Sequence, residues 1–184
     1  MRKTKYHIKK KIMPLLLAVA MAGTATPIYV AHPAIVKAAV SNAFGTNKIS
    51  LSAGSYTVPV SLKKADDVEQ NSMAAGAVGE NATLEVAEDG TASLEVELKA
   101  LNLYGMTGAA KDLKVYQGND TKSETKDVTV EKTDEAGNPT KIKFTIPESA
   151  KTTDGIYLHM MISPIAKETD AFLKVDYASL KGNE

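Results

Sequence analysis

Residues able to coordinate a metal are few in this chain, and several of them gather in one short segment. Tyr157-Leu158-His159-Met160-Met161 holds a tyrosine, a histidine and two methionines within five positions. In an extended strand, residues 157, 159 and 161 share one face, whereas the even-numbered residues share the other with Ile156 and Ile162. The second set is typical of a core, so Met160 is most simply a residue that fills a gap in the interior. His159 and Met161 then lie either on an ordinary surface or in a ligand groove.

The other polar residues favour no enzyme. His159 is the only histidine after residue 40 and the chain has no cysteine, so a His-rich or Cys-rich zinc centre is excluded by count. A Ser-His-Asp hydrolase would have to use His159, which lies inside an expected strand, and the sequence has no nucleophile-elbow motif, GxGxxG motif or phosphate loop. The paired carboxylates Asp66-Asp67 and Asp134-Glu135 lie in polar stretches, where a solvated loop is the simpler interpretation.

A haem iron has a smaller requirement. It needs one axial ligand from His, Met, Tyr or Cys and an apolar slot for the porphyrin. The chain beyond residue 40 offers several such ligands: His159, Met73, Met106, Met160, Met161, Tyr56, Tyr104, Tyr116, Tyr157 and Tyr177. Haem coordination therefore stays open where zinc and hydrolase chemistry do not.

The first 40 residues are typical of an export signal and are set aside from the fold. Arg2 and five lysines up to Lys11 form a basic region, and Ile12 to Ala22 is apolar but shorter than the about 20 residues that span a bilayer. Small residues suited to signal peptidase occur in Val36-Lys37-Ala38 and Ser41-Asn42-Ala43, so we expect cleavage between Ala38 and Ala43. The alternative is an uncleaved N-terminal anchor, because residues 28–40 extend the apolar stretch.

Export changes the charge of the chain from neutral to acidic. Seven of the 22 basic residues precede Ala38 and all 22 acidic residues follow it, which leaves 15 basic residues and a net charge of −7. Such a surface repels nucleic acid and anionic lipid. The absence of cysteine excludes a lipoprotein anchor, and no LPxTG-like sortase motif or hydrophobic tail is present. We therefore expect a secreted or cell-envelope protein whose mature chain does not insert into the membrane.

The apolar residues after Gly54 recur with a period of two, which is typical of half-buried strands. The clearest strand runs from Leu94 to Ala100, and Tyr56 to Leu62 forms another in which Pro59 indicates a sheet edge. The remaining expected strands hold Leu84 with Val86, Leu113 with Val115, Val128 with Val130, and the segments 142–146, 156–162 and 171–177. About eight short strands separated by Gly-containing turns predict a two-sheet antiparallel sandwich of seven to nine strands between Tyr56 and Tyr177.

Two segments do not follow this strand pattern. Residues 72–77 hold small side chains after a polar acidic run, which predicts one short helical turn. Residues 163–170 connect the last two strands. Loops on a rigid scaffold commonly carry binding sites, so we expect both segments at one end of the sandwich. Residues 41–53 are expected to form a flexible lead-in and residues 181–184 a tail.

Several segments, taken in order, resemble one known family. They are Tyr56–Leu62, Lys64-Ala65-Asp66, Ser72–Ala77, Ala82–Val86, the strand to Leu101, Leu103–Met106, Ile162-Ser163-Pro164 and Asp170–Tyr177. From about Gly54 to Leu180 this pattern is similar to the NEAT (near iron transporter) domains of Gram-positive surface proteins. The resemblance implies an immunoglobulin-like antiparallel β-sandwich, at residues 54–180, that holds haem between a short helical lip and the hairpin of the last two strands.

The resemblance also implies a set of haem-binding residues. They are Ser72, Met73, Tyr104, His159, Met160, Met161 and Phe172. Ser72 would donate to a propionate, and Met73 would cover the haem or ligate its iron. The usual haem-binding members carry a Tyr-x-x-x-Tyr motif at the start of the last strand, whereas this chain has no tyrosine between Pro164 and Tyr177. Tyrosinate ligation therefore does not carry over.

Without that tyrosine, a methionine pair is the expected iron ligand. Met73 facing Met161 is the first expectation, Met160 replaces Met161 if the strand is shifted by one residue, and His159 is the runner-up. Thioether ligation favours ferrous haem. The expected function is a haem carrier in iron acquisition, which receives haem from host haemoproteins or a neighbouring surface protein and relays it. The alternative is a NEAT-like protein-interaction module that does not bind haem.

Overall fold

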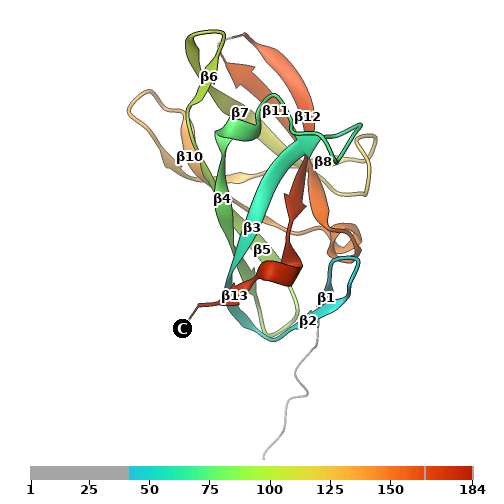
Figure 1. Cartoon of the computed structure of the whole chain (residues 1–184). Coiled ribbons are helices and arrows are strands. Elements are labelled where there is room, and N and C mark those ends of the chain that lie inside the picture. Colours follow the sequence, from blue (N-terminus) through green and yellow to red (C-terminus); the bar gives the residue numbers. More distant parts are fainter. Residues whose placement is uncertain (1–41, 164, 184) are drawn as a thin grey trace, which may run out of the picture. The chain divides into compact units, whose positions relative to one another are not determined.

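The computed structural model describes residues 42–163 and 165–183, and these residues form an all-β fold (Figure 1). The expected signal peptide, residues 1–40, lies outside the described residues. The strands are β1 Asn42–Phe44, β2 Ile49–Leu51, β3 Gly54–Lys64, β4 Val78–Val86, β5 Ala92–Leu98, β6 Leu101–Leu103, β7 Met106–Tyr116, β8 Thr125–Asp127, β9 Thr129–Thr133, β10 Pro139–Thr145, β11 Gly155–Ser163, β12 Lys167–Val175 and β13 Lys181–Gly182. The helical elements are the short 3₁₀ turns η1 Ala75–Ala77, η2 Glu148–Thr152 and η3 Tyr177–Ser179.

The long strand β3 connects two halves of the main sheet. The strand order is β6-β7-β11-β12-β3-β4-β5-β10-β9, and every pair is antiparallel. Residues 54–59 of β3 pair with β4, whereas residues 60–64 pair with β12. The alternating side chains of both halves then bury one shared apolar interior, which includes Val58, Leu62, Leu84, Leu94, Leu158 and Leu173. The antiparallel β-sandwich expected from the period of two is confirmed, as is the immunoglobulin-like fold that the family resemblance implies.

Some details of the strands differ from the expectation. Ten strands, β3 to β12, lie between Tyr56 and Tyr177 in the described part of the chain, because the short strands β6 and β8 add to the seven to nine that were expected. Pro59 does not mark a sheet edge, because it lies where β3 exchanges one partner strand for the other. Val130 is 45% exposed because β9 is a peripheral strand rather than a half-buried one.

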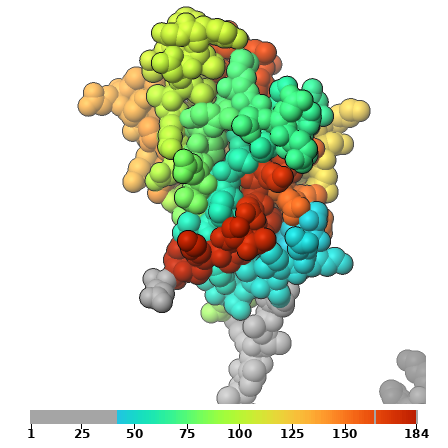
Figure 2. All heavy atoms as spheres, viewed as in Figure 1, coloured from blue at the N-terminus to red at the C-terminus, as the bar shows by residue number. Residues whose placement is uncertain are grey.

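The expected flexible lead-in is wrong over residues 42–51. These residues form the β1–β2 hairpin, and Phe44 and Leu51 are buried in the core. The tip of the hairpin is tied to the main body, because Thr46 donates to the Asp154 carboxylate through its backbone N–H and its hydroxyl. The C-terminal segment also belongs to the fold, since β13 pairs with the first half of β3. In Figure 2 the red C-terminal residues lie against the cyan N-terminal part of the domain.

The helical turn expected at residues 72–77 is confirmed, and we call these residues the lip. Ser72 Oγ accepts the N–H of Ala74 at 3.2 Å, and η1 follows directly. Ala74 and Ala77 are fully buried. Small side chains therefore allow this turn to lie directly against the sandwich.

Candidate functional site

A groove of about 460 Å³ separates the lip from strand β12. The pairing of β3 with β12 ends at Lys64 and Ala171, so the first residues of β12 extend past the end of β3. The lip occupies the space beside them. Ser72 and Met73 line one wall of the groove, and Lys167, Thr169 and Asp170 line the other. The expectation that the lip approaches the hairpin of the last two long strands is therefore confirmed.

The outward-facing residues of β11 and β12 form a second part of the site, which we call the β11–β12 face. Its cross-strand pairs are Tyr157 with Phe172, His159 with Asp170, and Met161 with Glu168. The even-numbered residues of β11 point into the core, as the alternation predicts. Asp170 belongs to both parts of the site, since it lines the groove and pairs with His159.

Two polar side chains, those of Tyr116 and His159, meet at Asp170. Its Oδ1 accepts the hydroxyl of Tyr116 at 2.8 Å and lies 2.8 Å from Nδ1 of His159. An ionised carboxylate only accepts hydrogen bonds, so Nδ1 of His159 carries the proton and Nε2 of a neutral imidazole keeps its lone pair. The His159 side chain is 27% exposed, which leaves the ring open to a ligand.

Tyr116 is a neutral phenol in this arrangement. Burial is the main cause that raises its pKa to about 12, and the hydrogen bond to Asp170 adds to the effect. A tyrosinate ligand would have to lose this proton and the bond to Asp170 together. Tyr116 therefore positions Asp170 and does not replace the tyrosine that is missing from the start of β12.

A lysine with a neutral partner lines the groove. Lys64 Nζ donates to the amide oxygen of Gln70 at 2.6 Å. Lys167 also lines the groove, as do Asp66 and Asp170. Because the hydrogen-bond partner of Lys64 is a neutral amide, an anionic group can approach Lys64 without first displacing a carboxylate from it.

The structure brings together some of the expected haem-binding residues. Met73, 37% exposed, and Ser72 lie in the groove. His159, Met161 and Phe172 lie on the β11–β12 face, where the Phe172 ring packs against Tyr157 with centroids 4.9 Å apart. Met73 and Met161 therefore belong to different parts of the site, and Met161 is not among the residues that line the groove.

Two expected residues lie elsewhere. Met160 is 1% exposed and packs in the core, because its side chain follows the even-numbered positions of β11. Tyr104 is 84% exposed at the turn between β6 and β7. Its φ of 53° and that of Gly105, 79°, are the positive backbone angles of this tight turn. Neither side chain reaches the groove in this structure. The burial of Met160 agrees with the interior packing that the alternation predicts, and Tyr104 is a turn residue in this structure.

Sequence reasoning considered Tyr116 only as a possible iron ligand and gave Asp170 no role, so it missed their contact with each other and with His159. The signal that could have found Asp170 is the hairpin register, since residues 159 and 170 are cross-strand partners in the β11–β12 hairpin. Tyr116 lies on β7, and no local pattern connects it with Asp170, 54 residues away.

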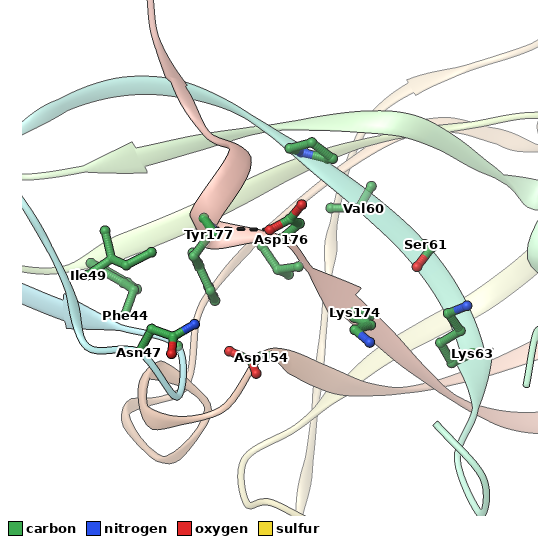
Figure 3. Close-up of a pocket in the computed structure, with 14 residues that line it drawn as sticks. Phe44, Asn47, Ile49, Val60, Ser61, Lys63, Asp154, Lys174, Asp176 and Tyr177 are labelled. Atoms are coloured by element: carbon green, nitrogen blue, oxygen red, sulfur yellow. Dashed lines mark hydrogen bonds between the residues drawn. The ribbon is translucent and has the colours of Figure 1, made fainter. Parts of the chain in front are cut away.

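A second cavity of about 430 Å³ lies at the other end of β12, beneath η3 and the β1–β2 loop (Figure 3). Its two carboxylates already have structural partners. Asp154 accepts from Thr46, and Asp176 accepts the N–H of Ala178 at 3.2 Å. Tyr177 lines the cavity and is 3% exposed, and its hydroxyl has no hydrogen-bond partner among the described residues. This cavity lies at one end of the sandwich. Within the described residues, no three His, Cys, Asp or Glu side chains are grouped so that they could hold a metal ion.

The fold and the site define a class of binding domain: an antiparallel sandwich with a 3₁₀ lip beside the hairpin of its last long strands. The family model of the NEAT domain, described as an iron transport-associated domain, matches residues 50–177. The chain belongs to this family, which associates it with iron and haem handling at the cell surface. No match is found among the curated proteins. Within the described residues, no helix is long and apolar enough to cross a membrane.

Proposed function

We propose that this protein binds haem at the groove between the lip and β12 and relays it during iron acquisition. The observation that carries the proposal is the position of the groove. It lies between the lip and the β11–β12 hairpin of a NEAT domain, with an imidazole and a thioether on the neighbouring face. These donor groups fit haem, because its iron needs as few as one axial ligand from the protein.

The residues around the groove match the different parts of a haem molecule. The Ser72 hydroxyl, whose oxygen accepts from Ala74, still has its own proton to donate to a propionate. Lys64 and Lys167 supply positive charge for the same groups. Met73 and Tyr157 offer apolar surface to the porphyrin, and the buried Phe172 ring packs against Tyr157 from the next strand. When bound, haem supplies an iron centre that the protein carries without chemical change.

The proposal includes export. The basic region and the apolar stretch at residues 2–22 direct the chain out of the cell, where the domain acts as a secreted or cell-envelope protein. Its haem comes from a host haemoprotein or a neighbouring surface protein. The net charge of −7 after export disfavours nucleic acid as a partner.

The test is a titration of hemin into the purified protein, followed by its Soret band. The double variant Lys64→Glu with Lys167→Glu should weaken hemin binding about tenfold, because reversing charges near the propionates costs on the order of 1 kcal/mol. Lys126→Glu with Lys132→Glu is the matched control. These lysines lie on the exposed strands β8 and β9, away from the groove, so binding should not change.

The competing function is a protein-interaction module without haem. The exposed turn of Tyr104 and Met106, which are 84% and 43% exposed, favours this alternative because it presents apolar side chains to solvent. If hemin produces no Soret shift with the wild-type protein, haem binding is refuted and the interaction module remains. Equal weakening by both pairs of lysine variants would show a non-specific charge effect and would also count against the groove.

A further inference from the structure

The hydrogen bonds around His159 have the form found around metal-binding histidines. Such a histidine donates one ring N–H to a carboxylate or carbonyl, which fixes the ring and directs the other nitrogen to the metal. Asp170 stands in this relation to Nδ1 of His159 at 2.8 Å, and Tyr116 holds the same carboxylate oxygen from β7. The three residues come from three neighbouring strands of one sheet. The ring is thus oriented before any ligand arrives.

We infer that Nε2 of His159 is the axial ligand of the haem iron and that the preferred ligand is ferric haem. This inference rests on the proposed haem-binding function. It replaces the expected methionine pair with an imidazole, and ferrous haem with ferric haem. Asp170 and Tyr116 are positioning residues, because they act on the iron through His159.

The surroundings of the competing ligands favour His159. Met161 lies on the same face, but its cross-strand partner is Glu168 and its thioether has no group that orients it. Met73 lies in the groove on an exposed part of the lip, where it serves as cover. Tyr116 keeps its proton for the bond to Asp170. Only the imidazole combines an open donor atom with a fixed direction.

The preference for ferric haem follows from the same hydrogen bonds. A carboxylate that accepts the Nδ1 proton increases the electron density on the imidazole and makes Nε2 a stronger donor. A stronger electron donor stabilises the more highly charged ferric iron, whereas a thioether raises the reduction potential and favours the ferrous state. Asp170 therefore moves the site toward the oxidised form of its ligand.

The experiment titrates ferric hemin and dithionite-reduced haem into the full chain and into single variants. His159→Ala should lose the wild-type Soret spectrum, and added imidazole should restore it. Asp170→Asn should weaken ferric binding by about ten- to a hundredfold, the range usual for a partner of a metal-binding histidine, and should raise the reduction potential. Tyr116→Phe should act in the same direction with a smaller effect. Wild type should bind ferric haem more tightly than ferrous haem.

Glu131→Gln is the matched control. It also changes a carboxylate to an amide, but Glu131 lies on the exposed strand β9, outside the groove and the β11–β12 face. Hemin affinity and reduction potential should stay at their wild-type values. Circular dichroism checks that each variant is folded, and His159→Gln replaces the alanine variant if that variant is not.

The outcomes separate this inference from the proposed function. If wild type binds hemin and His159→Ala retains the same spectrum and affinity, the ligand assignment is wrong while haem binding stands. Loss of the spectrum in Met161→Leu or Met73→Leu, with His159→Ala unaffected, would restore the methionine pair. If wild type binds no haem in either state, both the inference and the proposed function fail.

Discussion

Two outward faces of the sandwich follow the same alternation in sequence but differ in chemistry. On the face formed by β4, β5 and β10, which we call the paired-charge face, Lys141 contacts Glu95 at 2.5 Å and Lys143 contacts Glu85 at 2.6 Å. On the β11–β12 face, the corresponding positions hold a histidine, a methionine and an aromatic pair. The charged side chains of the paired-charge face form ion pairs with one another. The β11–β12 face instead leaves an imidazole nitrogen and a thioether available to a ligand.

The contrast between these faces shows which feature distinguishes a binding surface from an ordinary solvated surface. Both faces contain polar residues at alternate positions, so the period of two identifies only which side chains leave the core. The partners of those side chains carry the functional information. Cross-strand ion pairs close the paired-charge face, whereas Asp170 orients His159 and leaves its second nitrogen open.

The adjacent methionines of β11 give the largest expected effect on stability. Met160→Ala should lower the free energy of unfolding by about 2–5 kcal/mol, because it leaves a cavity in the core. Met161→Ala should change it by only about 0.5 kcal/mol, since that side chain lies on the outward face. Urea denaturation of both variants measures the difference. Equal losses, or a greater loss in Met161→Ala, would mean that β11 is shifted by one residue and that the β11–β12 face is assigned incorrectly.

Tyr116 and Tyr177 extend the comparison to two buried phenols, one with a partner and one without. Tyr116→Phe should cost about 1–3 kcal/mol at pH 7, because its hydroxyl donates to the Asp170 carboxylate. Tyr177→Phe should leave stability unchanged or raise it by about 1 kcal/mol, because the hydroxyl it removes has no partner among the described residues. The measurement is thermal and denaturant unfolding of both variants beside wild type.

The same two tyrosines predict how stability depends on alkaline pH. Burial raises the pKa of Tyr177, and burial with the bond to Asp170 raises the pKa of Tyr116 to about 12. Above about pH 10 the unfolded chain releases these protons while the folded chain keeps them, so stability falls as pH rises. Tyr177→Phe should reduce this fall. A variant that follows the wild-type curve between pH 9 and 11 would show that Tyr177 ionises freely in the folded protein.

The smallest expected effect concerns the paired-charge face. A double-mutant cycle on Lys143 and Glu85 should give a coupling energy of about 0.2–1 kcal/mol, since the pair is partly exposed. High salt should reduce the coupling, and hemin affinity should not respond to either substitution. Altered hemin binding in these variants would place a ligand surface on both faces and would remove the distinction between them.

Much of the fold could be predicted from the sequence, because its main signal is local. The alternation in residues 156–162 separates core from outward positions, and burial follows that pattern. Small residues at 72–77 predict the turn of the lip. The position of Pro59 and the β1–β2 hairpin could not be predicted from local sequence. Pro59 lies where β3 changes its partner strand, and Phe44 of the hairpin is buried, so both depend on contacts with segments far along the chain.

The sequence by itself determined which residues leave the core, the order of the NEAT segments and the absence of the usual tyrosine at the start of β12. Only the tertiary structure shows that Asp170 joins His159 to Tyr116, that β12 extends past the end of β3, and that Tyr104 lies outside the groove. The physical reason is register. Cross-strand neighbours are set by hydrogen-bond ladders between distant segments, and a slip of one residue would exchange every side chain between the core and the surface.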